Sequence, residues 1–157
     1  MTTQRPGALM SAHEGLVEAP IDQVRGAVLA VPTGRLRGAE APLVIGSTGD
    51  RYVTVSGGPS TFTATVAGVP LTIEVDRDAG WVQARGQWWW CGRFQVAEHA
   101  EGTLVTQQTF NCATGPVARL VPLTVGRGHR ANGRGALLRV LDELADRLHC
   151  ATRPLSD

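Results

Sequence analysis

The sequence predicts an α+β fold in which a C-terminal helix packs against an antiparallel sheet. Leu137, Leu141, Leu144 and Leu148 recur at steps of four, three and four, which places them on one face of a helix over residues 135–150. Residues 49–112 form short alternating segments separated by turn residues, a pattern typical of antiparallel strands. A surface helix with one apolar stripe needs an apolar partner, and this sheet supplies it.

The chain has the size and composition of one domain. It contains 157 residues, of which 43% are apolar and 18% charged, and no linker or change in composition divides it. We expect residues 1–12 to form a flexible N-terminal tail and residues 13–152 to form the domain. The start of the chain lacks an apolar run, which predicts neither a signal peptide nor a membrane anchor and favours a cytoplasmic protein.

Charge and residue usage argue against several function classes. The net charge is +1 and the basic residues are scattered, which favours neither nucleic acid nor an acidic membrane as a partner, and we expect no membrane insertion. Every basic side chain is arginine, so no lysine can form a Schiff base. The three cysteines are widely spaced and predict neither a disulfide framework nor a zinc site. No hydrolase, metalloprotease or nucleotide-binding motif occurs, so we expect no metal and no cofactor.

The chain opens with a strand followed by a short helix. Residues 13–19 read as the strand, and Pro20 suits the first turn of the helix that follows it. Valines recur at helical spacing as far as Val31, where proline and glycine end the pattern. Residues 33–42 read as a loop with room for one helical turn around residues 36–40.

Further strands follow in quick succession. We place them at residues 43–45 with 52–56, and at 61–66, 71–76, 81–85, 88–98 and 103–112. Alternation predicts that these side chains face the C-terminal helix: Phe62, Ala64, Val66, Leu71, Ile73, Val75, Trp88, Trp90, Phe94, Val96, Leu104 and Phe110. Trp89, Arg93 and Gln95 are expected to face outward.

Residues 115–134 are expected to form a helix that is kinked, because Pro122 cannot donate an internal hydrogen bond and several glycines weaken the segment. If this helix continues the register of the leucine stripe, Arg130 lies on the inner face among glycines that leave empty space. The alternative is that the helix bends and Arg130 reaches solvent, since an unpaired arginine is costly to bury.

The order of elements resembles the helix-grip fold of the SRPBCC superfamily, which includes START domains, birch-pollen allergens and polyketide cyclases/dehydrases. The resemblance rests on the stretch LVEAPIDQV at residues 16–24, on Gly102-Thr103 before the last strand, and on the final leucine helix. It implies a curved antiparallel sheet of about seven strands wrapped on a long C-terminal helix. It also implies an apolar cavity between them, which relatives use for lipids, hormones or polyketides. A filled core is the alternative.

The candidate ligand-binding residues are aromatic side chains and polar groups expected near this cavity: Trp88, Trp90, Phe94, Phe62, Phe110, Gln108, Arg130, His129 and Glu14. The aromatic rings would form apolar walls, and Arg130 would pair with Glu14, Gln108 or an acidic group of the ligand. His129 and His13 are the histidines best placed to transfer a proton.

Two functions stay open at this level, and Trp89, expected on the outer face, suggests a weaker third, a chaperone-associated or assembly role. One is the binding of a hydrophobic small molecule by a carrier or sensor. The other is catalysis by a polyketide cyclase or aromatase that uses the same cavity. The sequence assigns no residue a definite catalytic role. The expected partner is a hydrophobic small molecule, and the sequence leaves open a homodimer.

Overall fold

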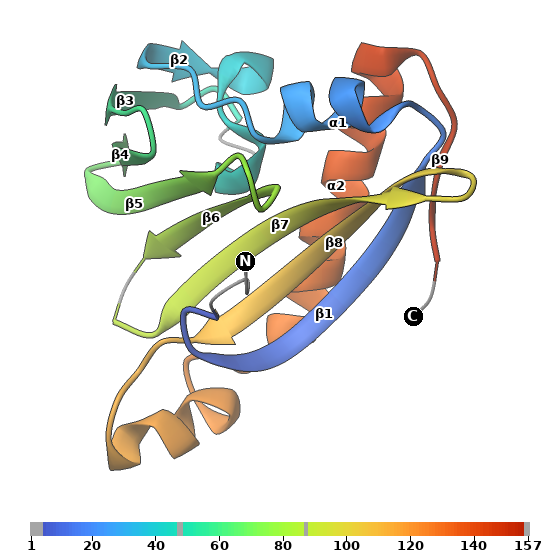
Figure 1. Ribbon diagram of the computed structural model, residues 1–157. Coiled ribbons are helices and arrows are strands. Elements are labelled where there is room, and N and C mark those ends of the chain that lie inside the picture. The colour runs from blue at the N-terminus through green and yellow to red at the C-terminus, as the bar shows by residue number, and fades with distance from the viewer. Residues whose placement is uncertain (1–4, 47–48, 87, 156–157) are drawn as a thin grey trace.

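A nine-stranded, curved antiparallel sheet and a long C-terminal helix make up most of the fold (Figure 1). The computed structural model describes residues 5–46, 49–86 and 88–155. The elements follow in this order: β1 (Ala8–Val17), α1 (Ile21–Val28), β2 (Gly34–Arg37), the 3-10 turns η1 (Gly38–Glu40) and η2 (Leu43–Ile45), β3 (Tyr52–Gly57), β4 (Thr61–Val66), β5 (Val69–Asp76), β6 (Trp81–Gly86), β7 (Trp90–His99), β8 (Gly102–Asn111), the 3-10 helix η3 (Pro116–Leu123), α2 (His129–Leu148) and β9 (Thr152–Pro154).

The sheet is ordered β2-β3-β4-β5-β6-β7-β8-β1-β9. Strands β2 to β8 follow the chain, and β1 then pairs with β8 on one side and with the C-terminal β9 on the other. The expected sheet of about seven strands therefore gains two members, β2 and β9. Both were missed because they are short, four and three residues, and carry glycine, arginine or proline rather than an apolar alternation.

Several boundaries differ from the predictions. Strand β1 starts at Ala8, so residues 8–12, expected in the N-terminal tail, belong to the sheet. Residues 43–45 form a 3-10 turn rather than a strand. Figure 1 shows η3 as a separate segment beyond the end of the sheet, so residues 115–134 are not one kinked helix. Pro122 lies inside η3, and Gly128 caps the start of α2 at a φ of 90°, which favours glycine.

Helix α2 packs along the face of the sheet that we call the inner face. Leu137, Leu141 and Leu144 are buried, which confirms the predicted stripe, whereas Leu148 is only partly buried against the core. One close approach is at β1, where a Cβ atom added to Gly15 would lie 2.7 Å from Leu141 Cδ1. The helix thus sits on the sheet where a strand presents no side chain. Within the described part of the chain, no helix is long and apolar enough to cross a membrane.

The predicted inner face is largely correct for β4 to β7 and wrong for β8. Phe62, Ile73 and Phe94 belong to the core cluster under the helix. On β8, residue Val105 pairs with Val96 and belongs to that cluster, so Leu104 and Phe110 face the opposite side, which we call the outer face. The error arose because β8 carries apolar side chains on both faces, and alternation alone did not decide between them.

Loss of Leu141 should strongly destabilise the protein. We expect Leu141→Ala to lower the free energy of unfolding by about 2–5 kcal/mol, because the side chain is buried between α2 and the sheet. Gly15→Ala should also destabilise, since its methyl group would contact the Leu141 methyl groups. The double variant should lose less than the sum of the two single variants, by roughly 0.5–3 kcal/mol, because one change makes room for the other.

Urea unfolding of the four proteins measures this coupling. Gly26→Ala on α1 is the matched control, because a Cβ atom there meets nothing within 4 Å and alanine favours a helix by up to about 1 kcal/mol. Additive losses at Gly15 and Leu141 would contradict the packing described here.

Candidate functional site

The best-formed cleft lies between the N-terminal half of α2, β8 and the adjoining ends of β5 to β7. It has a volume of about 450 Å³. Its apolar walls come from Ile45, Val69, Leu71, Trp89, Trp90, Val125 and Ala136, and its polar groups come from Gln107, Thr109, Arg127, His129 and Asn132. This volume and this mixture of apolar walls with a few polar groups are typical of a small-molecule site.

The cleft exists because α2 presents small side chains at this end. Gly133 and Ala136 line the cleft, whereas Leu137 and Leu141 follow on the buried stripe. At the opposite wall, the indole of Trp90 lies over Gly92, where an added Cβ would come 2.6 Å from the ring atom Cζ2. Glycine on the sheet thus lets the ring lie flat, and glycine on the helix leaves space in front of it.

Two buried polar atoms beside Gly133 lack a hydrogen-bond partner among the described residues: His13 Nε2 and Gln107 Oε1. A Cβ atom on Gly133 would lie 2.6 Å from Gln107 Oε1 and 3.3 Å from His13 Cδ2. Gln107 Nε2 donates to Thr109 Oγ1 at 3.1 Å, so its amide is held in place. Buried polar groups are nearly always paired, so these two atoms beside Gly133, with Gln107 lining the cleft, indicate a position where a polar group binds.

His129 stands at the first turn of α2, where its Nδ1 lies 3.1 Å from Ser11 Oγ on β1. Burial lowers the pKa of His129 below its ordinary value, and the neighbouring Arg130 and His13 lower it further. The imidazole is therefore held neutral to a lower pH than a free histidine, which suits a hydrogen-bond acceptor or a general base. Among the described residues, no three His, Cys, Asp or Glu side chains gather to hold a metal ion.

The structure brings two of the nine expected site residues into this cleft: Trp90 and His129. Phe62 and Phe94 lie on the same inner face but are buried inside the core cluster. From the sequence, a filled core and a cavity between sheet and helix were alternatives, and the fold contains both a filled core and a cleft. The leucine half of α2 closes over the sheet, and the glycine half leaves it open.

The other five expected residues lie elsewhere. Trp88 is 55% exposed in the turn before β7, and Arg130 is exposed at the start of α2. Phe110, Gln108 and Glu14 belong to the outer face, because each is one residue out of phase with inward-facing neighbours on β8 or β1. Arg130 therefore reaches solvent, as the alternative reading of this segment expected, and it pairs with neither Glu14 nor Gln108.

Sequence reasoning missed Trp89, Gln107, Thr109, Arg127 and Asn132 as cleft residues. Trp89 was expected outside and is buried, because β7 begins only at Trp90 and Trp89 lies in the turn before it, where strand alternation does not apply. Gln107 and Thr109 follow Val105 at steps of two, so the correct face of β8 would have revealed them. Helical spacing places three further residues on the same side of α2 as His129: Asn132, Gly133 and Ala136. This spacing is visible in the sequence.

The outer face carries a polar network of its own, centred on Arg93. This side chain is buried, and its Nε and NH2 groups donate to Gln83 Oε1 at 2.9 and 2.7 Å. Its guanidinium also lies 4.1 Å from the ring centre of Trp81, a cation–π distance. Nearby, burial raises the pKa of Cys91 to about 12, so this thiol stays protonated and behaves as a small apolar side chain.

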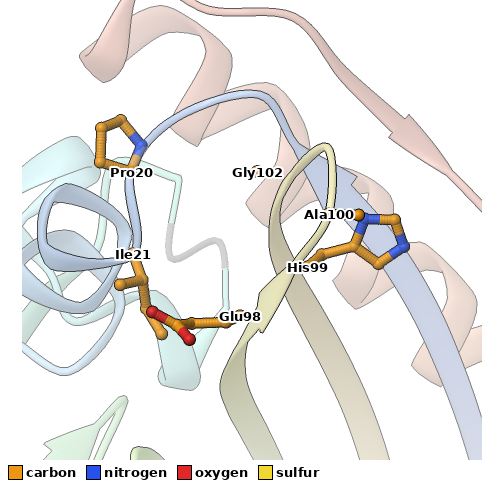
Figure 2. Close-up of a pocket in the computed structure, with 6 residues that line it drawn as sticks. All are labelled: Pro20, Ile21, Glu98, His99, Ala100 and Gly102. Atoms are coloured by element: carbon orange, nitrogen blue, oxygen red, sulfur yellow. The ribbon is translucent and has the colours of Figure 1, made fainter.

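A wider depression of about 620 Å³ lies between the start of α1 and the β7–β8 turn (Figure 2). Its titratable residues are Glu98 and His99, and Figure 2 shows their side chains pointing in different directions, with Glu98 beside Ile21. His99 Nδ1 accepts a hydrogen bond from the backbone of Glu101 at 3.1 Å. The histidine therefore shapes the turn, and the Glu98 and His99 side chains do not converge on a common point.

Removing the Gln107 amide should lower the stability of the ligand-free protein less than the loss of a fully hydrogen-bonded buried amide does. We expect Gln107→Leu to change the free energy of unfolding by less than about 1 kcal/mol, because an unsatisfied buried acceptor disappears together with one hydrogen bond. Gln83→Leu is the matched control. It should cost about 1–3 kcal/mol, because Gln83 accepts from Arg93 and donates to Glu74. Equal losses in urea unfolding would contradict the unpaired state of Gln107.

His129 should make stability depend on pH below neutrality. Since its pKa is lower in the folded protein, the unfolded chain binds the proton more tightly. Its contribution is complete above about pH 6.5 and is lost as the pH falls through the lowered pKa. We expect the free-energy difference between wild type and His129→Gln, measured by urea unfolding at several pH values, to shrink on acidification. A difference that grows on acidification would mean a raised pKa.

No model of a known protein family matches the chain, and no curated protein matches it either. What the chain does is therefore argued from the residues around the cleft and from the chemistry they offer.

Proposed function

We propose that this chain is a helix-grip protein of the SRPBCC type that binds a hydrophobic small molecule in the cleft beside α2. The supporting architecture is the long C-terminal helix across an antiparallel sheet, with the first strand next to the last two. The observation that carries the proposal is the unpaired buried atom Gln107 Oε1 in the cleft, with a second unpaired atom, His13 Nε2, close to the same glycine, Gly133. A ligand that donates a hydrogen bond to Gln107 would remove this cost.

The cleft favours a ligand with three features. Trp89, Trp90 and Leu71 favour a flat or branched apolar body. The Gln107 acceptor favours a hydroxyl or N–H donor at the inner end. Arg127, which lines the cleft and is exposed, takes the place expected for Arg130 and favours an acidic or strongly polar group at the mouth. Hydroxylated aromatic acids and hydroxy fatty acids combine these features.

A second function, that of a cyclase or aromatase, is supported by His129. Its lowered pKa and its place on the cleft wall would let it accept a proton from a polyketide-like substrate. In that reaction the cleft would fold the chain of the substrate, and the imidazole would remove a proton next to a carbonyl group. The two functions differ in the role of His129. A carrier needs only the shape of the cleft, whereas an enzyme also needs His129 as a base.

Filling the cleft should abolish binding and leave the fold intact. Ala136 lines the cleft, so Ala136→Phe should place a ring where the ligand lies and weaken binding by tenfold or more. Ala131→Phe is the matched control, because Ala131 is exposed on the same helix and its variant should bind as wild type does. The measurement is quenching of tryptophan emission, from Trp89 and Trp90, during titration with hydroxylated aromatic acids and hydroxy fatty acids.

If no member of such a panel changes the emission of the wild type, or if both phenylalanine variants bind equally well, the cleft is not the ligand site. His129→Gln separates the two functions in the same titration. A carrier should retain its affinity within a few-fold, and product analysis with polyketide-like substrates should show no turnover in either protein. An enzyme should lose turnover in the variant while still binding.

A further inference from the structure

The end of the molecule that holds the cleft also gathers exposed apolar side chains. In the described part of the chain eight large apolar residues are exposed, and only Tyr52 lies away from this end. The other seven are Leu9, Val69, Trp88, Val117, Leu120, Leu123 and Val125. Val69 and Val125 line the cleft, Leu9 pairs with Phe110 at the end of β8, and Trp88 precedes β7. The exposed apolar residues are therefore concentrated at one end of the molecule rather than spread over its surface.

The 3-10 helix η3 turns an apolar face toward solvent. A 3-10 helix has three residues per turn, so Val117, Leu120 and Leu123 align along one side. These three are 51%, 55% and 73% exposed. On the adjacent side, Val121 is fully buried and the carbonyl of Ala118 accepts a hydrogen bond from Asn111 Nδ2 at 2.8 Å. The segment is thus anchored to β8 through one side while it presents valine and leucine on the other.

The same region is strongly basic, although the whole chain is almost neutral. Between Glu101 and Asp142 the sequence contains five arginines and no aspartate or glutamate. Arg119 lies within η3, and Arg127 and Arg130 follow between η3 and the first turn of α2; all three are exposed. These three exposed arginines thus lie within or shortly after the segment that presents the apolar side of η3.

We propose that η3 and its flanking arginines form a docking surface for an anionic phospholipid bilayer. Leucine and valine would enter the boundary between headgroups and acyl chains, and the arginines would bind lipid phosphates, as in other peripheral basic and apolar segments. Trp88, 55% exposed beside them, is suited to the interface. The mouth of the cleft, with Val69 and Val125, would then face the bilayer. This inference does not depend on the function proposed for the cleft.

Geometry and charge favour a bilayer over other occupants. Figure 1 shows η3 standing out from the sheet as a projection, which suits insertion into a soft surface better than a groove-filling contact. A second copy docked face to face would place two sets of arginines against each other, and like charges repel. No acidic side chain from this segment could pair with them, because residues 102–141 contain none.

Vesicle co-sedimentation tests the proposal. The full chain should bind vesicles of phosphatidylcholine with about 30% phosphatidylglycerol more tightly than pure phosphatidylcholine vesicles, and added salt should weaken binding. Leu120→Ser with Leu123→Ser should reduce binding at least about tenfold. Arg119→Gln with Arg130→Gln should reduce it roughly 30-fold, at about fivefold for each charge.

The matched control changes the same charge elsewhere. Arg37→Gln with Arg51→Gln removes two exposed arginines at the β2–β3 edge and should change binding less than twofold. All these side chains are exposed, so thermal unfolding should be unchanged in every variant. Brominated lipids should quench tryptophan emission in wild type, and Trp88→Phe should lose part of that quenching. Gln107→Leu and Ala136→Phe should bind vesicles normally, which separates this test from that of the cleft.

Three results would overturn the proposal. The wild type would fail to bind the anionic vesicles, or the control pair would lose as much affinity as Arg119→Gln with Arg130→Gln. In the third, light scattering without lipid would show a dimer that Leu120→Ser with Leu123→Ser dissociates, and vesicle binding would be absent. That last result would assign the surface to a second copy of the chain.

Discussion

The close approach of α2 to the sheet determines the rest of the structure. Where Leu141 meets Gly15, helix and strand are in tight contact, because a strand residue without a side chain makes room for a leucine. About one to two turns earlier, the helix presents glycine and alanine near Gln107 and Thr109, and the same approach leaves a cleft of about 450 Å³. Well-packed proteins leave few voids, so this change from large to small residues along one helix creates the site.

Much of the fold could be predicted from local pattern. The alternation of β4 to β7 and the leucine spacing of α2 depend on side-chain periodicity, and periodicity follows directly from backbone geometry. The helix identity of residues 137–148 was equally clear. Elements that depend on long-range pairing were missed. β9 exists because it lies beside β1, nearly the whole chain away, and nothing within its three residues indicates a strand.

The site was less predictable than the fold. Trp88, Trp89 and Trp90 are consecutive, and β7 begins only at Trp90, so alternation along the strand does not decide where Trp88 and Trp89 lie. Strand β8 has apolar and polar side chains on both faces, so only its pairing with Val96 assigns Gln107 to the interior. Arg93 was correctly placed on the outer face, yet it is buried there by a network with Gln83 and Trp81 that no local pattern indicates.

The order of the sheet also affects how the protein behaves when it meets other copies of itself. An open sheet has two edges with unpaired backbone groups, which are sites for edge-to-edge aggregation. Here the outermost strands are β2 and β9, only four and three residues long. β2 carries Arg35 and Arg37, and β9 ends in Pro154, which has no N–H to donate. The long, apolar strands β7, β8 and β1 lie in the interior of the sheet, shielded from intermolecular pairing by neighbours on both sides.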